Sequence, residues 1–120
     1  MRHIPPPNDF DDDARQVWKA AQTQLRLQGT WSKTDVPLLE MYVRAVRLAQ
    51  RARSAAEEMP FVRASSGAGM LAHVELKVAE SAEAAALKYA QALLLTPESR
   101  KRHNVVLPTG ADDQLARLIG

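Results

Sequence analysis

Two runs of basic side chains are the residues of this sequence best suited to bind a ligand, because rows of guanidinium and ammonium groups attract phosphate. The first run lies in a stretch without acidic residues and consists of Arg44, Arg47, Arg51 and Arg53. Spacings of three and four residues place its first three members on one face of a helix, where they could follow the phosphates of a nucleic acid. The alternative is a solvated face, or an ion-pair seam between subunits opposite Glu57, Glu80 or Glu83.

The second basic run, Arg100-Lys101-Arg102-His103, is predicted to lie at the end of a short helix. Cations at that position oppose the negative end of the helix dipole, so a purely structural role is the alternative here as well. Neither run by itself predicts a DNA-binding protein.

Residue types that support catalysis or metal binding are present but are not arranged to do so. Gly67-Ala68-Gly69 is not followed by the Gly-Lys-Ser/Thr of a phosphate-binding loop. The histidines, at positions 3, 73 and 103, are not paired four residues apart with another type of metal ligand. Asp11-Asp12-Asp13 would fan out through about 200° of a helix, so we interpret these carboxylates as charges that favour a helix start. We expect no enzymatic activity, no metal site and no cofactor.

Helical periodicity predicts an all-α fold that combines a long helical hairpin with an N-terminal helix and short C-terminal helices. We expect a flexible, extended Pro-rich arm over residues 1–8. The first helix should be capped by Asn8 or Asp9 and should stop at Gly29.

The second helix should open at Thr34 and run to about Glu58, with Ser32 and Asp35 as an alternative capping pair. A short β-hairpin or a loop is expected over 59–70, where proline, serine and glycine interrupt the helical pattern.

The second long helix of the hairpin is predicted over 76–95, and a short helix capped by Thr96 should follow it to about His103. Residues 112–119 favour a last amphipathic turn or two. These elements predict a helical domain over 9–103 and a C-terminal tail over 104–120.

Composition limits the class of protein. The chain has 120 residues, 25% of them charged, with a formal net charge of only +2 and no cysteine. The small net charge argues against a histone-like DNA coat, and the lack of cysteine excludes disulfides and thiolate metal sites. No apolar run approaches the roughly 20 residues of a membrane helix, and Met1 to Pro7 lacks the apolar core of a signal peptide. We therefore expect a soluble intracellular protein.

Alanine is the commonest hydrophobic residue of the chain. A core built from so many small side chains is thin, and neighbouring subunits often complete such a core. Trp18 and Trp31 are interpreted as core or interface anchors.

Four motifs, read in order, resemble those of a known family. They are Ala-Arg-x-x-Trp at 14–18, Gly-Thr-Trp-Ser-Lys-Thr-Asp at 29–35, Leu-x-x-Tyr at 39–42, and Leu-Leu-Thr-Pro-Glu-Ser-Arg at 94–100. This order resembles the small terminase subunits of tailed bacteriophages, specifically the P27 family, over about residues 5–103. Leu94 stands where that family usually has glycine, which suggests that the preceding helix continues into the turn. Val74 stands where proline is common, which suggests an earlier helix start.

The resemblance implies a non-catalytic recognition subunit of the DNA-packaging motor. Such a subunit is expected to form a homo-oligomeric ring in the cytoplasm of the bacterial host, to bind double-stranded viral DNA, and to deliver it to the large subunit. The residues expected to contact DNA are Arg44, Arg47, Arg51, Arg53, Arg100, Lys101 and Arg102. The residues expected to bind a protein partner are Leu115, Leu118 and Ile119. The alternatives are a helical scaffold without DNA contact, or a small helix-turn-helix regulator around 87–103.

Overall fold

Helices form all of the regular structure in the described part of the chain. The computed structural model describes residues 3–58, 67–107 and 113–119, and among these it contains no strand. The elements are α1 (Asp12–Leu27), the 3-10 turn η1 (Lys33–Asp35), α2 (Val36–Glu58), α3 (Gly67–Ala92), α4 (Pro97–Arg102) and α5 (Asp113–Ile119). The predicted all-α class is confirmed.

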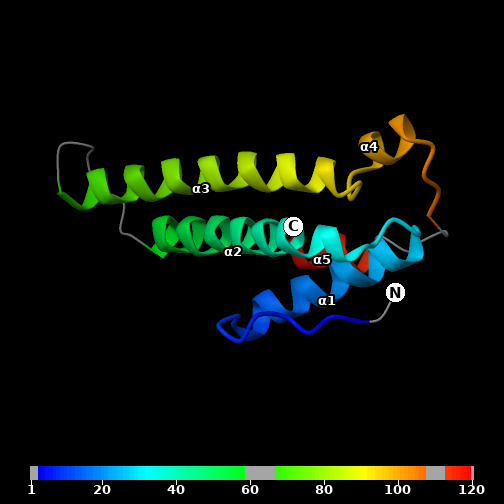
Figure 1. Ribbon diagram of the computed structural model, residues 1–120. Helices are drawn as coiled ribbons and strands as arrows, with labels where there is room; N and C mark the ends of the chain where they lie inside the picture. Colours follow the sequence, from blue (N-terminus) through cyan, green and yellow to red (C-terminus); the bar gives the residue numbers. More distant parts are fainter. Residues whose placement is uncertain (1–2, 59–66, 108–112, 120) are drawn as a thin grey trace.

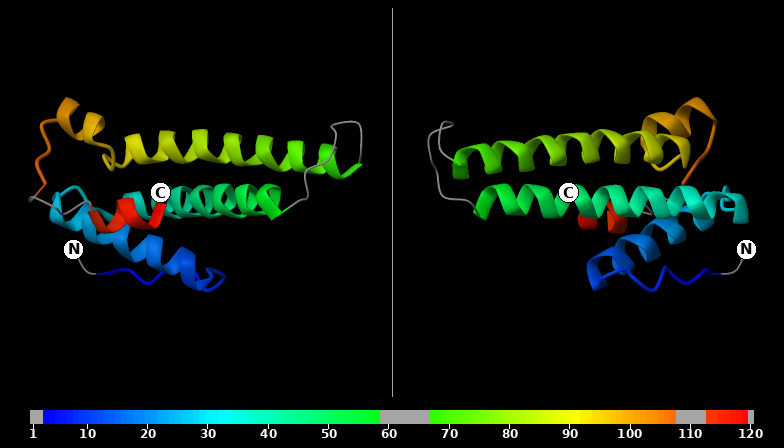
Figure 2. Two further views of the ribbon diagram at one scale, coloured as in Figure 1. Left: turned by 180° about the vertical axis from the view of Figure 1, so that it is seen from behind. Right: turned by 60° about the vertical axis from the view of Figure 1, so that its left-hand side comes forward.

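The long helices α2 and α3 lie side by side and antiparallel, and together they give the molecule its elongated shape of 51 × 32 × 23 Å (Figure 1). Helix α1 packs obliquely on the side of α2 that faces away from α3, and the short α5 packs against α1 (Figure 2). The predicted hairpin of two long helices is confirmed.

The core is unevenly filled along the hairpin. Large buried side chains gather where α1 meets α2, among them Trp18, Leu25 and Leu39, with exposed fractions of at most 1%. Toward the other end of the hairpin, the residues buried between α2 and α3 are alanines, namely Ala49, Ala52, Ala79 and Ala82. Alanines let two helices approach closely but bury little apolar area, so this end gains less from the hydrophobic effect.

Helix α1 begins later than predicted. Asp11, not Asn8 or Asp9, is the N-cap, because its backbone is extended and its carboxylate accepts the Ala14 N–H at 2.8 Å. Phe10 is buried edge-on against Trp18. Burial of this ring holds residues 8–10 in a turn ahead of the helix. Packing of Phe10, and not the capping preference of Asn8 or Asp9, therefore sets where α1 begins.

The start of α2 uses the alternative capping pair. Ser32 and Asp35 form a capping box around η1, in which the Ser32 N–H donates to the Asp35 carboxylate at 3.2 Å. Thr34 lies inside this turn and does not cap the helix. At the other end of the preceding loop, α1 stops as predicted, with Gly29 in the left-handed region at φ 74°.

The start of α3 differs from the expected loop. The helix begins at Gly67, so 67–70 is helical, as the absence of a proline at Val74 suggested. The rest of the segment in which a hairpin or loop was expected, 59–66, lies outside the described residues.

The end of α3 contradicts the prediction that Leu94 continues the helix. The helix ends at Ala92, and Leu94 adopts the left-handed region at φ 61°. The Leu95 N–H donates to the Ala90 carbonyl at 2.8 Å, and the Leu94 N–H donates to the Gln91 carbonyl at 3.1 Å, which is the pattern of a Schellman motif. This turn buries both Leu93 and Leu95. Their burial outweighs the cost of a left-handed leucine.

Candidate nucleic-acid interface

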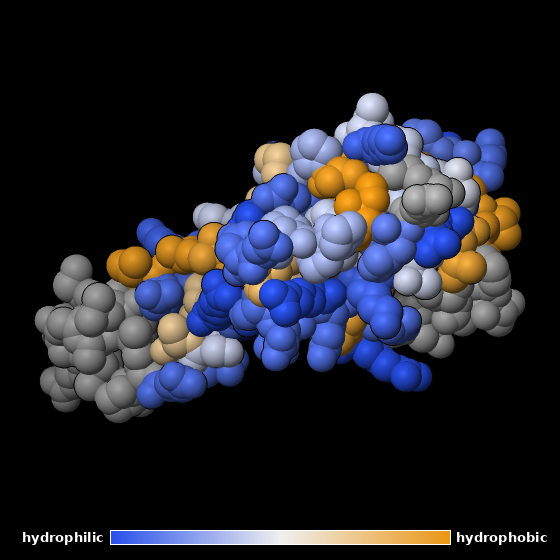
Figure 3. All heavy atoms as spheres, turned by 60° about the horizontal axis from the view of Figure 1, so that its bottom comes forward, coloured by the Kyte–Doolittle hydropathy of each residue, from blue (hydrophilic) through white to orange (hydrophobic). Residues whose placement is uncertain are grey.

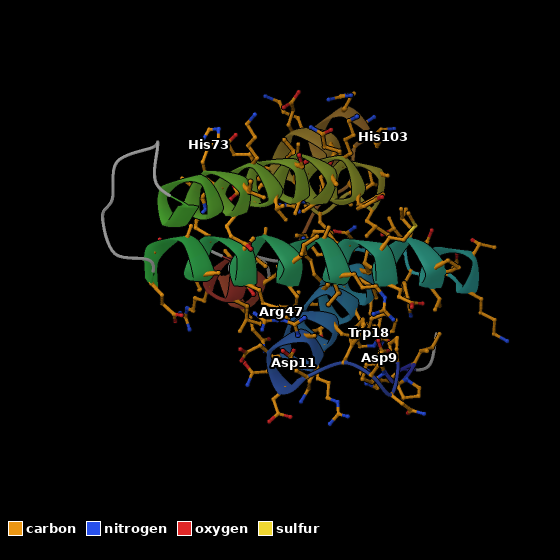
Figure 4. All side chains as sticks on the ribbon, turned by 90° about the vertical axis from the view of Figure 1, so that its left-hand side faces the viewer. Asp9, Asp11, Trp18, Arg47, His73 and His103 are labelled. Atoms are coloured by element: carbon orange, nitrogen blue, oxygen red, sulfur yellow. The ribbon has the colours of Figure 1, made fainter. Side chains whose placement is uncertain are left out.

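The first three arginines of α2 lie on one helix face, as their spacing predicts, and we call Arg44, Arg47 and Arg51 the arginine row. The row faces residues 9–13, which we call the acidic segment (Figure 4). Arg44 donates two hydrogen bonds to the Asp9 carboxylate, at 2.8 and 3.1 Å, and two to Glu40, at 2.8 and 3.2 Å. Its guanidinium also lies 4.9 Å from the centre of the Phe10 ring.

Asp11 joins the other two members of the row. Its Oδ2 accepts from Arg47 at 2.9 Å and from Arg51 at 2.7 Å, while its Oδ1 caps α1. Arg47 also lies 3.6 Å from Asp13 and is the least exposed of the row, with 15% of its side chain accessible. One carboxylate therefore connects the start of α1 to two successive turns of α2.

The electrostatics of this face follow from those contacts. The hydrogen bonds from Arg47 and Arg51 hold the pKa of Asp11 well below its ordinary value, and Arg44 lowers the pKa of Asp9. In return, Asp9 and Glu40 raise the pKa of Arg44. The three arginines of the row have four carboxylates within ion-pair distance among the described side chains. The nearby carboxylates therefore balance the positive charge of the arginine row.

Arg53 is directed elsewhere. It donates to Glu83 of α3 through its Nε at 2.8 Å, and this contact raises the pKa of the guanidinium. Glu83 is one of the three acids named as partners of an ion-pair seam. The structure forms this pair within one chain, across the α2–α3 hairpin.

The second basic run lies on and just after α4, which forms as predicted with Thr96 as N-cap and Pro97 at the first position. Arg100 is 6% exposed and donates to the Leu94 carbonyl at 3.4 Å, so its guanidinium is directed into the α3–α4 turn. Lys101 and Arg102 are exposed, and Arg102 forms an i,i+4 pair with Glu98 at 3.0 Å. Two of the three predicted residues of this run are therefore accessible to a ligand.

The predicted partner-binding residues of α5 are divided between core and surface. Leu115 is 3% exposed and belongs to the core shared with α1, and Leu118 is partly buried against the same core. Ile119 is 41% exposed. Helix α5 therefore packs on the helical domain, and Ile119 is the residue of the three that is most available to a partner.

A groove of about 450 Å³ lies beside Ile119 and was not anticipated from the sequence. Val46 and Ala49 of α2 and Ala86 and Leu87 of α3 contribute to its lining. Tyr42 also lines it, and burial raises the pKa of this phenol to about 12. The wide apolar face of α2 was the available signal, but which part of it stays open depends on where α5 packs.

A second apolar surface consists of exposed Met41, Leu48 and Val74. Met41 and Leu48 are seven residues apart and share one face of α2, and Leu48 and Val74 line a common depression between α2 and α3. Leu48 follows Val46 by two residues, which turns it by about 200° around α2, so this surface and the groove lie on different faces of the helix. The surface seen when the underside of Figure 1 is brought forward is mainly hydrophilic and is interrupted by separate hydrophobic patches (Figure 3).

Among the described residues, no three His, Cys, Asp or Glu side chains lie close enough together to hold a metal ion. His73 and His103 lie on the side of the hairpin away from Asp11 and Arg47 (Figure 4). None of the described helices is long and apolar enough to cross a membrane.

A family model described as phage terminase, small subunit, matches residues 14–109. The match extends from the first turn of α1 to beyond α4. Neither a curated protein nor a solved structure matches the chain.

Proposed function

The chain belongs to the phage terminase small-subunit family, and from this premise we propose that it is the subunit that recognises viral DNA and delivers it to the large terminase subunit. The observation that carries the proposal is the family match, which includes both basic runs. The family supports a role in packaging the phage genome. DNA recognition, the lack of enzymatic activity and a place in the host cytoplasm are parts of the proposal.

Lys101 and Arg102 are the first DNA contacts that we propose. Both are exposed, and both lie in the last turn of α4, a short helix at one end of the molecule. The Arg102–Glu98 pair is a surface ion pair between adjacent turns, and such pairs contribute little free energy, so phosphate can compete for this guanidinium. The arginine row and Arg53 can add contacts only if they exchange their present carboxylate partners.

Assembly into a ring would make few contacts per subunit sufficient, because each subunit adds its contacts at high effective concentration. Two features support assembly. The alanine-filled end of the hairpin buries little apolar area, and the groove beside Ile119 and the Met41–Leu48–Val74 surface lie on different faces. Two unlike surfaces suit a head-to-tail interface, which closes into a ring when the rotation permits.

The large subunit is the protein partner that we propose for the exposed part of α5. Truncation after Asn104 removes Leu115 from the core, so loss of stimulation in that variant could reflect unfolding of α1. Ile119→Ser is the better variant, because it changes an exposed side chain of α5. Loss of stimulation with an intact oligomer would support docking here, whereas loss of the oligomer would make α5 an assembly element.

The experiment that tests DNA recognition compares two double variants that each remove two positive charges. Lys101→Ala/Arg102→Ala should weaken retention of a phage DNA fragment and should reduce the slope of log K against log salt by about two per subunit. Lys77→Ala/Lys88→Ala removes two exposed lysines of α3 and is the matched control. Equal retention by the two variants would contradict the proposed contacts.

A helical scaffold without DNA contact is the second candidate, favoured by the internal pairing of every arginine of the first run. It predicts no DNA retention even at low salt. Native mass measurement adds a separate test, since a ring supports the terminase role and a dimer favours a small regulator.

A further inference from the structure

We propose that the acidic segment is an internal competitor for phosphate, which occupies the arginine row until DNA displaces its carboxylates. The inference rests on the proposed DNA-binding function and adds to it a regulation of the same surface. In this arrangement, α4 makes the first contact, and Arg44 and Arg51 of the row join only after an exchange of partners.

The geometry of the contacts is that of an occupied anion site. Asp9 approaches Arg44 with both carboxylate oxygens, at 2.8 and 3.1 Å, which is the two-point geometry that a guanidinium also offers to phosphate. Asp11 accepts from two guanidiniums through one oxygen, as a phosphate oxygen between two arginines does. The acidic segment thus places negative oxygens where a backbone phosphate would bind.

Exposure makes the exchange feasible. The side chains of Arg44 and Arg51 are 46% and 61% exposed, and Asp9 is 64% exposed, so solvent and salt reach these pairs. Exposed ion pairs are weakly stabilising and are screened by salt. Arg47 lies deeper, at 15% exposure, and we expect it to keep its contacts with the acidic segment.

The acidic segment is attached on both sides, which keeps its carboxylates close to the row. Before it, the Ile4 backbone is hydrogen-bonded to Gln22 and Trp18 of α1. At its other end, its last two residues, Asp12 and Asp13, form the first turn of α1. Phe10 between Asp9 and Asp11 is buried. The carboxylates therefore compete at high effective concentration. Rotation of the exposed Arg44 and Arg51 side chains separates them from Asp9 and Asp11 without unfolding the backbone and leaves Asp11 as the cap of α1.

The test neutralises these carboxylates and keeps the helix cap. Asp9→Asn/Asp11→Asn is suitable because asparagine caps a helix as well as aspartate does. Asp12→Asn/Glu58→Gln is the matched control, because it brings the net charge to the same +4, two above the parent's +2. Both acids are exposed, and among the described side chains neither pairs with the arginine row: Asp12, although part of the acidic segment, pairs with Arg15. Binding of a fluorescent DNA duplex would be measured by anisotropy between 50 and 200 mM salt.

We expect the Asp9→Asn/Asp11→Asn variant to bind about tenfold more tightly than the control at the lowest salt. Its salt slope should be steeper by about two, because two more arginines per subunit neutralise phosphates. Equal affinity of the two variants, or weaker binding by Asp9→Asn/Asp11→Asn, would overturn the inference.

DNA binding by the parent chain and circular dichroism of the variants keep the outcomes distinct. If the parent and both variants fail to bind DNA at 50 mM salt, the proposed function itself fails and this inference fails with it. If the parent binds through α4 but the two charge variants match each other, only the inference fails. If circular dichroism shows that the double variant is unfolded, Asp9→Asn against Glu58→Gln decides: tighter binding by Asp9→Asn supports the inference, and parity overturns it.

Discussion

Gln22 is the side chain whose replacement tests most directly how the N-terminal arm is held. It is fully buried, and its amide donates to the Ile4 carbonyl at 3.0 Å while its carbonyl oxygen accepts the Ile4 N–H. Trp18 donates to the same Ile4 carbonyl at 2.9 Å. Gln22→Leu keeps the volume of the side chain and removes two of these three hydrogen bonds.

The expected loss follows from those contacts. A typical hydrogen bond contributes about 1 kcal/mol net, so two bonds suggest a loss of about 2 kcal/mol in the free energy of unfolding. The loss is limited because a released arm regains hydrogen bonds to water. For a chain of this length, it corresponds to a fall in Tm of about 8 °C.

Thermal unfolding and hydrogen exchange are the assays. The amide of Ile4 should exchange much faster in Gln22→Leu than in the parent. Gln16→Leu makes the same replacement at an exposed position of α1 and is the control, expected to change Tm little. If Gln22→Leu is as stable as Gln16→Leu and Ile4 remains protected, these hydrogen bonds do not hold the arm and the reasoning is refuted.

Two further predictions concern stability. Leu94→Gly should raise the free energy of unfolding by about 1 kcal/mol, because glycine removes the cost of a left-handed leucine and loses only part of that gain to chain entropy. Urea unfolding measures this change. A loss of stability would show that the packing of the half-buried leucine side chain contributes more than its backbone conformation costs. Because the folded pKa of Asp11 is lowered, its contribution to stability is present above about pH 4 to 5 and is lost as the pH falls through the folded pKa. Tm measured from pH 7 to pH 2 should therefore fall less steeply for Asp11→Asn than for the parent or Asp12→Asn, and equal slopes would contradict the assigned ion pairs.

Local signals in the sequence were sufficient for the fold class and for several helix ends. Thr96 followed by proline predicted the start of α4, and Gly29 predicted the stop of α1, since a cap or a left-handed turn depends on a few adjacent residues. The spacing of Arg44, Arg47 and Arg51 placed them on one face for the same reason. The motifs that resemble terminase small subunits were likewise readable in order along the chain.

Periodicity, the cap of α4, the stop of α1 and the family motifs were therefore readable from residues close together in the chain. The tertiary structure alone decided that Asp11 caps α1, that Leu94 turns left-handed, and that Arg44 meets Asp9, 35 positions away. Periodicity shows which face of a helix carries charge, but the partner of that face depends on how α1 packs on α2. That packing follows from the burial of Phe10 and Trp18, a long-range term that outweighs the local preferences around it.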